Sequence, residues 1–68
     1  MIVVTFQKNP LTQEIDVQSW FHTTKELGRN IKSIPGVTMI FYPDQVPYGF
    51  YAAPSQYKYY DGRLVKKS

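Results

Sequence analysis

The chain has 68 residues and no cysteine, so its fold depends on the packing of side chains without any disulfide. Its single histidine, His22, also leaves a structural zinc site without the usual ligands. One core in a chain of this size supplies no more than about 3–5 kcal/mol. An apolar fraction of 43% is nevertheless too high for a disordered chain. We therefore expect a single folded domain over residues 1–68, held by a well-packed core or by association.

The sequence contains no apolar stretch long enough to cross a membrane as a helix. The residues that follow Met1 also lack the positive charge of a signal peptide. The absence of cysteine is consistent with a reducing compartment. We therefore expect a cytoplasmic location.

Three segments have the pattern of β-strands. Residues 1–7 are rich in β-branched side chains that alternate between two faces, which predicts a strand inside a sheet. Residues 37–42 are almost continuously apolar, which predicts a second central strand. After a loop stiffened by Pro43 and Pro47, residues 48–53 resume a strand-like pattern.

The segment between the first two strands has the periodicity of a helix. Apolar or small residues recur there at spacings of three and four, which predicts an amphipathic helix. Asp16 stands where an N-cap is expected, and Pro35-Gly36 would end the helix. Gly28 within the stripe suggests a close approach to the sheet. The stripe consists of Val17, Trp20, Phe21, Thr24, Leu27, Gly28, Ile31 and Ile34.

The last segment predicts a β-hairpin. Asp61-Gly62 accepts the positive φ of a type I′ turn and lies between residues 57–60 and 63–66. The predicted order is therefore strand, helix, strand, strand, hairpin. This order predicts an α+β fold in which one amphipathic helix packs on one face of a small, mainly antiparallel sheet. The other sheet face is left uncovered, and we expect it to contribute to binding.

The chain offers few groups for catalysis. Its carboxylates form no convincing pair, and His22 and Glu26 would form at most a solvated pair on the surface of the predicted helix. No glycine-rich phosphate loop is present. We therefore expect a protein without enzymatic activity, cofactor or bound metal. The carboxylates are Glu14, Asp16, Glu26, Asp44 and Asp61.

Basic charge and tyrosines coincide in the C-terminal third. Four basic and four acidic residues balance over residues 1–53, so the net charge of +3 belongs to residues 54–68. A two-residue turn would place Lys58, Tyr60, Arg63 and Val65 on one face of the hairpin. The other face, with Tyr57, Tyr59, Leu64 and Lys66, is more apolar and is expected to face the core.

These residues predict a surface that binds another protein, because tyrosine and arginine are enriched at binding hot spots. The protein would be an accessory subunit, a regulator or an inhibitor, of the kind that viruses or mobile elements encode. A homodimer through an open edge strand or sheet face is a further option. The predicted partner-binding residues are Tyr48, Tyr51, Lys58, Tyr60, Arg63 and Lys66.

Two other interpretations of the same surface stay open. In one, the tyrosines stack on the bases of single-stranded nucleic acid while the basic groups contact phosphates. The pI of 9.3 only just reaches the range of nucleic-acid-binding domains, and no known nucleic-acid motif is present. In the other, the tyrosines simply suit strands and the hairpin binds nothing.

Overall fold

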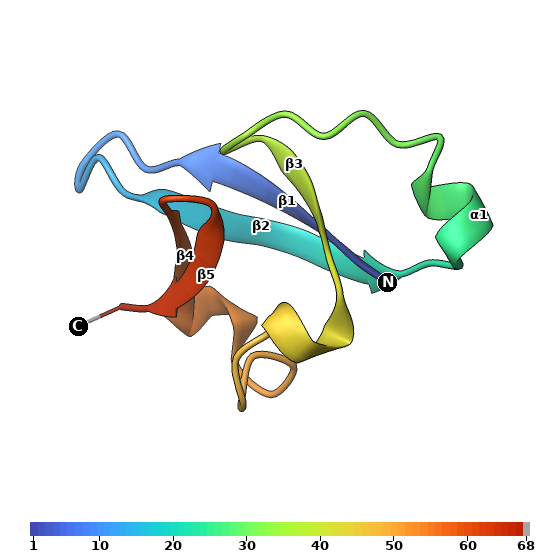
Figure 1. Cartoon of the computed structure of the whole chain (residues 1–68). Coiled ribbons are helices and arrows are strands. Elements are labelled where there is room, and N and C mark those ends of the chain that lie inside the picture. The colour runs from blue at the N-terminus through green and yellow to red at the C-terminus, as the bar shows by residue number, and fades with distance from the viewer. Residues whose placement is uncertain (68) are drawn as a thin grey trace.

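The computed structural model describes residues 1–67, and in this part of the chain five strands form one antiparallel sheet (Figure 1). Their order across the sheet is β3-β1-β2-β4-β5. The sheet curls into a half-barrel, so that the β4–β5 hairpin crosses over β1 and β2 (Figure 1). The strands are β1 (Ile2–Lys8), β2 (Ile15–His22), β3 (Thr38–Phe41), β4 (Tyr57–Tyr60) and β5 (Arg63–Lys66).

The prediction of an α+β fold with a helix packed on the sheet is wrong. The first part of the predicted helix is strand β2, and the described residues contain one α-helix of only four residues, α1 (Lys25–Gly28). Asp16 is not an N-cap, because it lies in β2 opposite Lys58. Instead, Thr24 caps α1 by accepting a hydrogen bond from the backbone N–H of Leu27 at 3.2 Å. Two short 3-10 turns, η1 (Pro43–Gln45) and η2 (Pro54–Gln56), complete the structure.

A β-bulge explains why the start of the predicted helix has helical spacing. The register of β1 against β2 shifts at Gln18, which has no partner in β1. The extra residue places Val17 opposite Phe6 and Trp20 opposite Val4, so Val17 and Trp20 share a face although they are three positions apart. A spacing of three, which is typical of a helix, therefore occurs here in a strand.

The strand predicted at residues 1–7 is confirmed as β1, which lies inside the sheet between β2 and β3. Ile2, Val4 and Phe6 point to the core, and Val3 on the other face is also buried. The strand predicted at residues 37–42 is confirmed as β3. Its predicted central position is wrong, because β3 pairs only with β1 and forms one edge of the sheet.

Residues 48–53 form tight turns, so the strand predicted there is wrong. Gly49 has a φ of +92°, which takes the chain out of the extended conformation. The N–H of Phe50 donates to the carbonyl of Pro47 at 3.1 Å, and that of Ala53 donates to the carbonyl of Gly49 at 3.1 Å. These turns direct the side chain of Phe50 into the interior, where it is completely buried.

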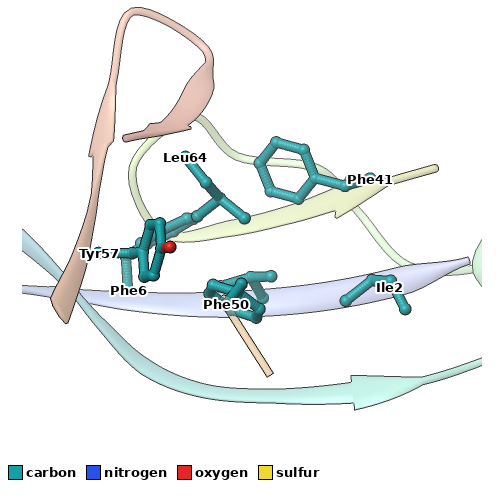
Figure 2. Packing of buried hydrophobic residues seen from close by; sticks show 7 residues of the cluster. Ile2, Phe6, Phe41, Phe50, Tyr57 and Leu64 are labelled. Carbon is teal, nitrogen blue, oxygen red and sulfur yellow. The ribbon is translucent and has the colours of Figure 1, made fainter. Parts of the chain in front are cut away.

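Phe50 completes the core in the concave side of the sheet (Figure 2). Its ring packs edge-to-face against that of Tyr57, with the centroids 5.6 Å apart. The hydroxyl of Tyr57 donates to the carbonyl of Tyr48 at 2.9 Å, which ties the loop to β4. A loop residue thus covers part of the core for which a helix was expected. The buried cluster consists of Ile2, Val4, Phe6, Phe41, Phe50, Tyr57 and Leu64.

The hairpin predicted at the end of the chain is confirmed. Asp61 and Gly62 have φ values of +50° and +81°, as a type I′ turn requires. Tyr60 lies opposite Arg63, and Lys58 opposite Val65, which is the predicted register. Tyr57 and Leu64 on the other face are buried, so the more apolar face of the hairpin points to the core.

Candidate functional site

The hairpin brings three of the six predicted site residues together. Lys58, Tyr60 and Arg63 share its outer face, and the latter two lie opposite each other beside the turn. Tyr60 and Arg63 are exposed, whereas Lys58 is half-buried. Lys66 is exposed near the end of β5, on the opposite face from Arg63.

The other two predicted residues lie in the loop between η1 and η2. The side chain of Tyr48 is fully exposed. Tyr51 is 44% exposed, and its ring contacts two residues of β2. The six residues therefore fall into a hairpin group and a loop group.

Two ion pairs neutralise part of the basic charge of the C-terminal segment. Lys58 Nζ lies 2.9 Å from Glu14 Oε2, and Lys67 Nζ lies 3.0 Å from Asp16 Oδ1. Both pairs join the hairpin end of the chain to β2 and the turn before it. Among the described residues, Arg63 is therefore the basic residue of the hairpin's outer face that has no acidic partner.

The pKa of Asp16 is lowered by the hydrogen bond from Lys67, with smaller contributions from Asn9 and from the charges of Lys67 and Lys58. Partial burial opposes this shift. A lowered pKa in the folded state means that the ionised carboxylate stabilises the fold.

We expect the Asp16 carboxylate to stabilise the fold fully above its ordinary pKa of 3.8 and to lose this effect as the pH falls through the lowered value. Urea unfolding of wild type and Asp16→Asn at neutral pH and below pH 4 measures the difference. The variant should have a lower free energy of unfolding than wild type at neutral pH, and this difference should become smaller in acid. A gap that stays constant or widens in acid would contradict the assignment.

A cluster of aromatic side chains lies where β2 approaches the loop that carries Tyr51. The ring of Trp20 lies 5.0 Å from that of Tyr51 and 5.3 Å from that of His22, both in edge-to-face geometry. The rings of His22 and Tyr51 are stacked, with an interplanar angle of 17° and centroids 5.8 Å apart. Trp20 also contacts the buried Phe50 at 5.9 Å. We call Trp20, His22 and Tyr51 the aromatic patch.

An open groove of about 340 Å³ adjoins the aromatic patch through Trp20. This volume is at the lower end of the range for small-molecule sites. The lining contains no charged residue, so the groove suits an uncharged, partly apolar group. The groove is lined by Val17, Gln18, Ser19, Trp20, Pro54 and Ser55.

The second face of the sheet is only partly polar. Phe21 is 48% exposed there and flanks the buried Val3, with the half-buried Ile40 on the other side. Thr5 and Ser19 share a hydrogen bond between their hydroxyls at 2.6 Å on the same face. No helix packs on this face in the described chain, so it offers scattered apolar contacts between polar groups.

The helical spacing conceals Trp20 and His22 as candidate site residues, because it places both on a predicted helix. Their spacing of two, next to Phe21, would have placed them on one face of a strand. Tyr51 was predicted, but its two neighbours in β2 were not.

Comparison of the chain with protein-family models, with curated proteins and with solved structures found no match. None of the helices among residues 1–67 is long and apolar enough to cross a membrane. The same residues contain no cluster of three or more side chains suited to hold a metal ion.

Proposed function

We propose that the protein is a non-enzymatic binding module for another protein, and that the aromatic patch with the adjoining groove is its main binding surface. The observation that carries this proposal is the pair of exposed rings, His22 and Tyr51, packed on the half-buried Trp20 beside an uncharged groove. Tryptophan and tyrosine dominate the energy of protein interfaces, because they bury a large area with few rotatable bonds.

The packing of the aromatic patch supports this role. Each of the three rings contacts the other two, and Trp20 is anchored on the buried Phe50. Side chains that are already held in place lose little conformational entropy when a partner binds. The stacked position of His22 on Tyr51 also gives the imidazole a packing role, which favours binding over catalysis.

The exposed pair Tyr60 and Arg63 at the hairpin turn provides a second contact area for the same kind of partner. An accessory subunit, a regulator or an inhibitor would use such a surface. These finer roles depend on the partner that the protein binds.

Affinity capture from the source cell tests the proposed surface. We expect the double variant Trp20→Ala, Tyr51→Ala to lose the captured partner, because the two aromatic rings that would contact the partner are removed. Tyr60→Ala with Arg63→Ala at the hairpin turn is the comparison variant and should reduce capture less, because this pair is the second contact area. Equal recovery by wild type and the patch variant, with folding confirmed by circular dichroism, would contradict the assignment of the surface.

Single-stranded nucleic acid is less favoured as the ligand, because Lys58 and Lys67 are held by Glu14 and Asp16. Binding to phosphates would require these lysines to exchange a partner that they already have. We expect labelled single-stranded oligonucleotides to bind only weakly at moderate salt. Micromolar binding that falls steeply with salt and is lost in Tyr60→Ala with Arg63→Ala would favour nucleic acid instead.

A further inference from the structure

Strand β2 has an open edge over its C-terminal half. It pairs with β4 only through Ile15 and Asp16, and after these residues the neighbouring chain leaves the sheet as η2. The other edge of β2 is paired with β1 from Ile15 to His22, except at the bulge residue Gln18. Residues beyond the bulge at Gln18 therefore have a strand neighbour on one side only.

The hydrogen bonds of β1 and β2 identify which backbone groups face this open edge. The N-terminal ammonium of Met1 donates to the carbonyl of Thr23 at 3.0 Å, and the N–H of Thr23 donates to the carbonyl of Met1 at 2.9 Å. Bonded and non-bonded pairs alternate along an antiparallel ladder. Phe21 is therefore bonded to β1, whereas the N–H and C=O groups of Trp20 and His22 point away from it.

The same two residues thus supply aromatic side chains and free backbone groups. Outside the β1–β2 ladder, the described residues donate no hydrogen bond to the carbonyls of Trp20 and His22 and accept none from their N–H groups. An unpaired strand edge is a template for an added strand.

We propose that the protein binds an extended segment of its partner as an added strand, paired with the backbone of Trp20 and His22. This inference rests on the proposed function and specifies how the partner is bound. Every strand pair in the described sheet is antiparallel, and the added strand continues this arrangement. Because η2 packs against β2 and shares with it a groove that reaches Trp20, the pairing is short and the side chains of the segment must add affinity.

The surroundings of the edge define the chemistry of the segment. One of its side chains enters the groove, whose lining is uncharged, so that residue is apolar or neutral. An antiparallel segment has its N-terminal side next to α1, which follows β2 directly. Lys25 and Arg29 are exposed in and beside α1 and outnumber the exposed Glu26, and none of the three forms an ion pair within residues 1–67. The structure therefore fits an extended peptide with an acidic residue on the N-terminal side of its apolar residue.

The decisive comparison is between His22→Pro and His22→Thr. Both variants lose the imidazole, but only proline also removes the N–H that faces the open edge. Proline is tolerated at a strand edge because this N–H takes no part in the β1 ladder. Thermal unfolding of both variants checks that each is folded.

The probe is a random linear peptide display library selected on the immobilised wild-type protein. We expect enriched peptides with an acidic residue before an apolar one, and at least about tenfold weaker binding of the synthesised peptide to His22→Pro than to His22→Thr. Lys25→Glu with Arg29→Glu should weaken the same peptide severalfold. No enrichment over the uncoated surface would overturn the proposal, as would equal affinity of the Pro and Thr variants.

Two further measurements separate this inference from the proposed function. If Trp20→Ala abolishes peptide binding while the Pro and Thr variants bind equally, the aromatic patch binds the partner but strand addition is wrong. Sedimentation of the wild type tests a second copy of the chain as occupant. If the wild type forms a dimer that His22→Pro does not form, the added strand comes from a second copy of this chain and not from a partner.

Discussion

Phe50→Ala is expected to leave the protein largely unfolded at room temperature. Its side chain is completely buried, and truncation of such a phenylalanine costs about 3–5 kcal/mol. A core of this size supplies about the same free energy in total. Loss of the near-ultraviolet circular dichroism signal and of a cooperative urea transition would show the effect.

Tyr48→Ala is the matched control for this prediction, because it removes an aromatic ring from the same loop. The Tyr48 side chain is fully exposed, and its carbonyl can still accept the hydrogen bond from Tyr57. We expect its free energy of unfolding to stay within about 0.5 kcal/mol of wild type. If Phe50→Ala were equally harmless, the loop would not contribute to the core.

Gly62→Val is expected to destabilise the protein by about 2 kcal/mol through the backbone alone. Gly62 has a φ of +81°, which a β-branched residue adopts only with strain. No atom lies within 4 Å of the position that a Cβ would take, so crowding is not involved. Urea unfolding with unchanged m-value would measure this effect.

Gly28→Ala is the comparison for Gly62→Val, because Gly28 does not have a positive φ. A Cβ there would lie 3.2 Å from Met1 Sδ, so this flexible side chain would have to shift by a few tenths of an ångström. Alanine also favours the helix, so the two effects oppose each other and the net change should stay within about 1 kcal/mol. If Gly28→Ala lowered the free energy of unfolding more than Gly62→Val, packing around Gly28 would restrict the sequence more than the backbone conformation of the turn.

The parts of the fold that could be predicted are those defined by neighbours in the sequence. The alternation in residues 1–7 and the turn residues Asp61 and Gly62 specify β1 and the hairpin through local geometry. The register of the hairpin follows from the length of its turn, so the pairing of Tyr60 with Arg63 was also predictable.

Strand β2 was not predictable because its pattern is ambiguous on its own. The bulge at Gln18 converts the strand period of two into a spacing of three between Val17 and Trp20. Only the pairing with β1 shows that this residue is extra. Trp20 and His22 were therefore missed, and the aromatic patch that they form with Tyr51 was missed with them.

The two ion pairs also could not be predicted from the sequence, because their partners are distant in the chain. Residues 54–68 contain four basic residues and one acidic residue, so the net charge of +3 belongs to this segment. Glu14 and Asp16 are about forty positions or more from Lys58 and Lys67, and the sheet brings them within 3.0 Å. The basic surface expected from composition is therefore partly neutralised.

By itself, the sequence determined that this cysteine-free chain folds around an apolar core, and it determined the two segments whose conformation depends on adjacent residues, β1 and the C-terminal hairpin. Tertiary structure decided the identity of β2, the burial of Phe50 and the open edge beside Trp20 and His22. The physical reason is that a strand gains its hydrogen bonds, and a core residue its contacts, from partners distant in the chain. Local periodicity does not specify those partners.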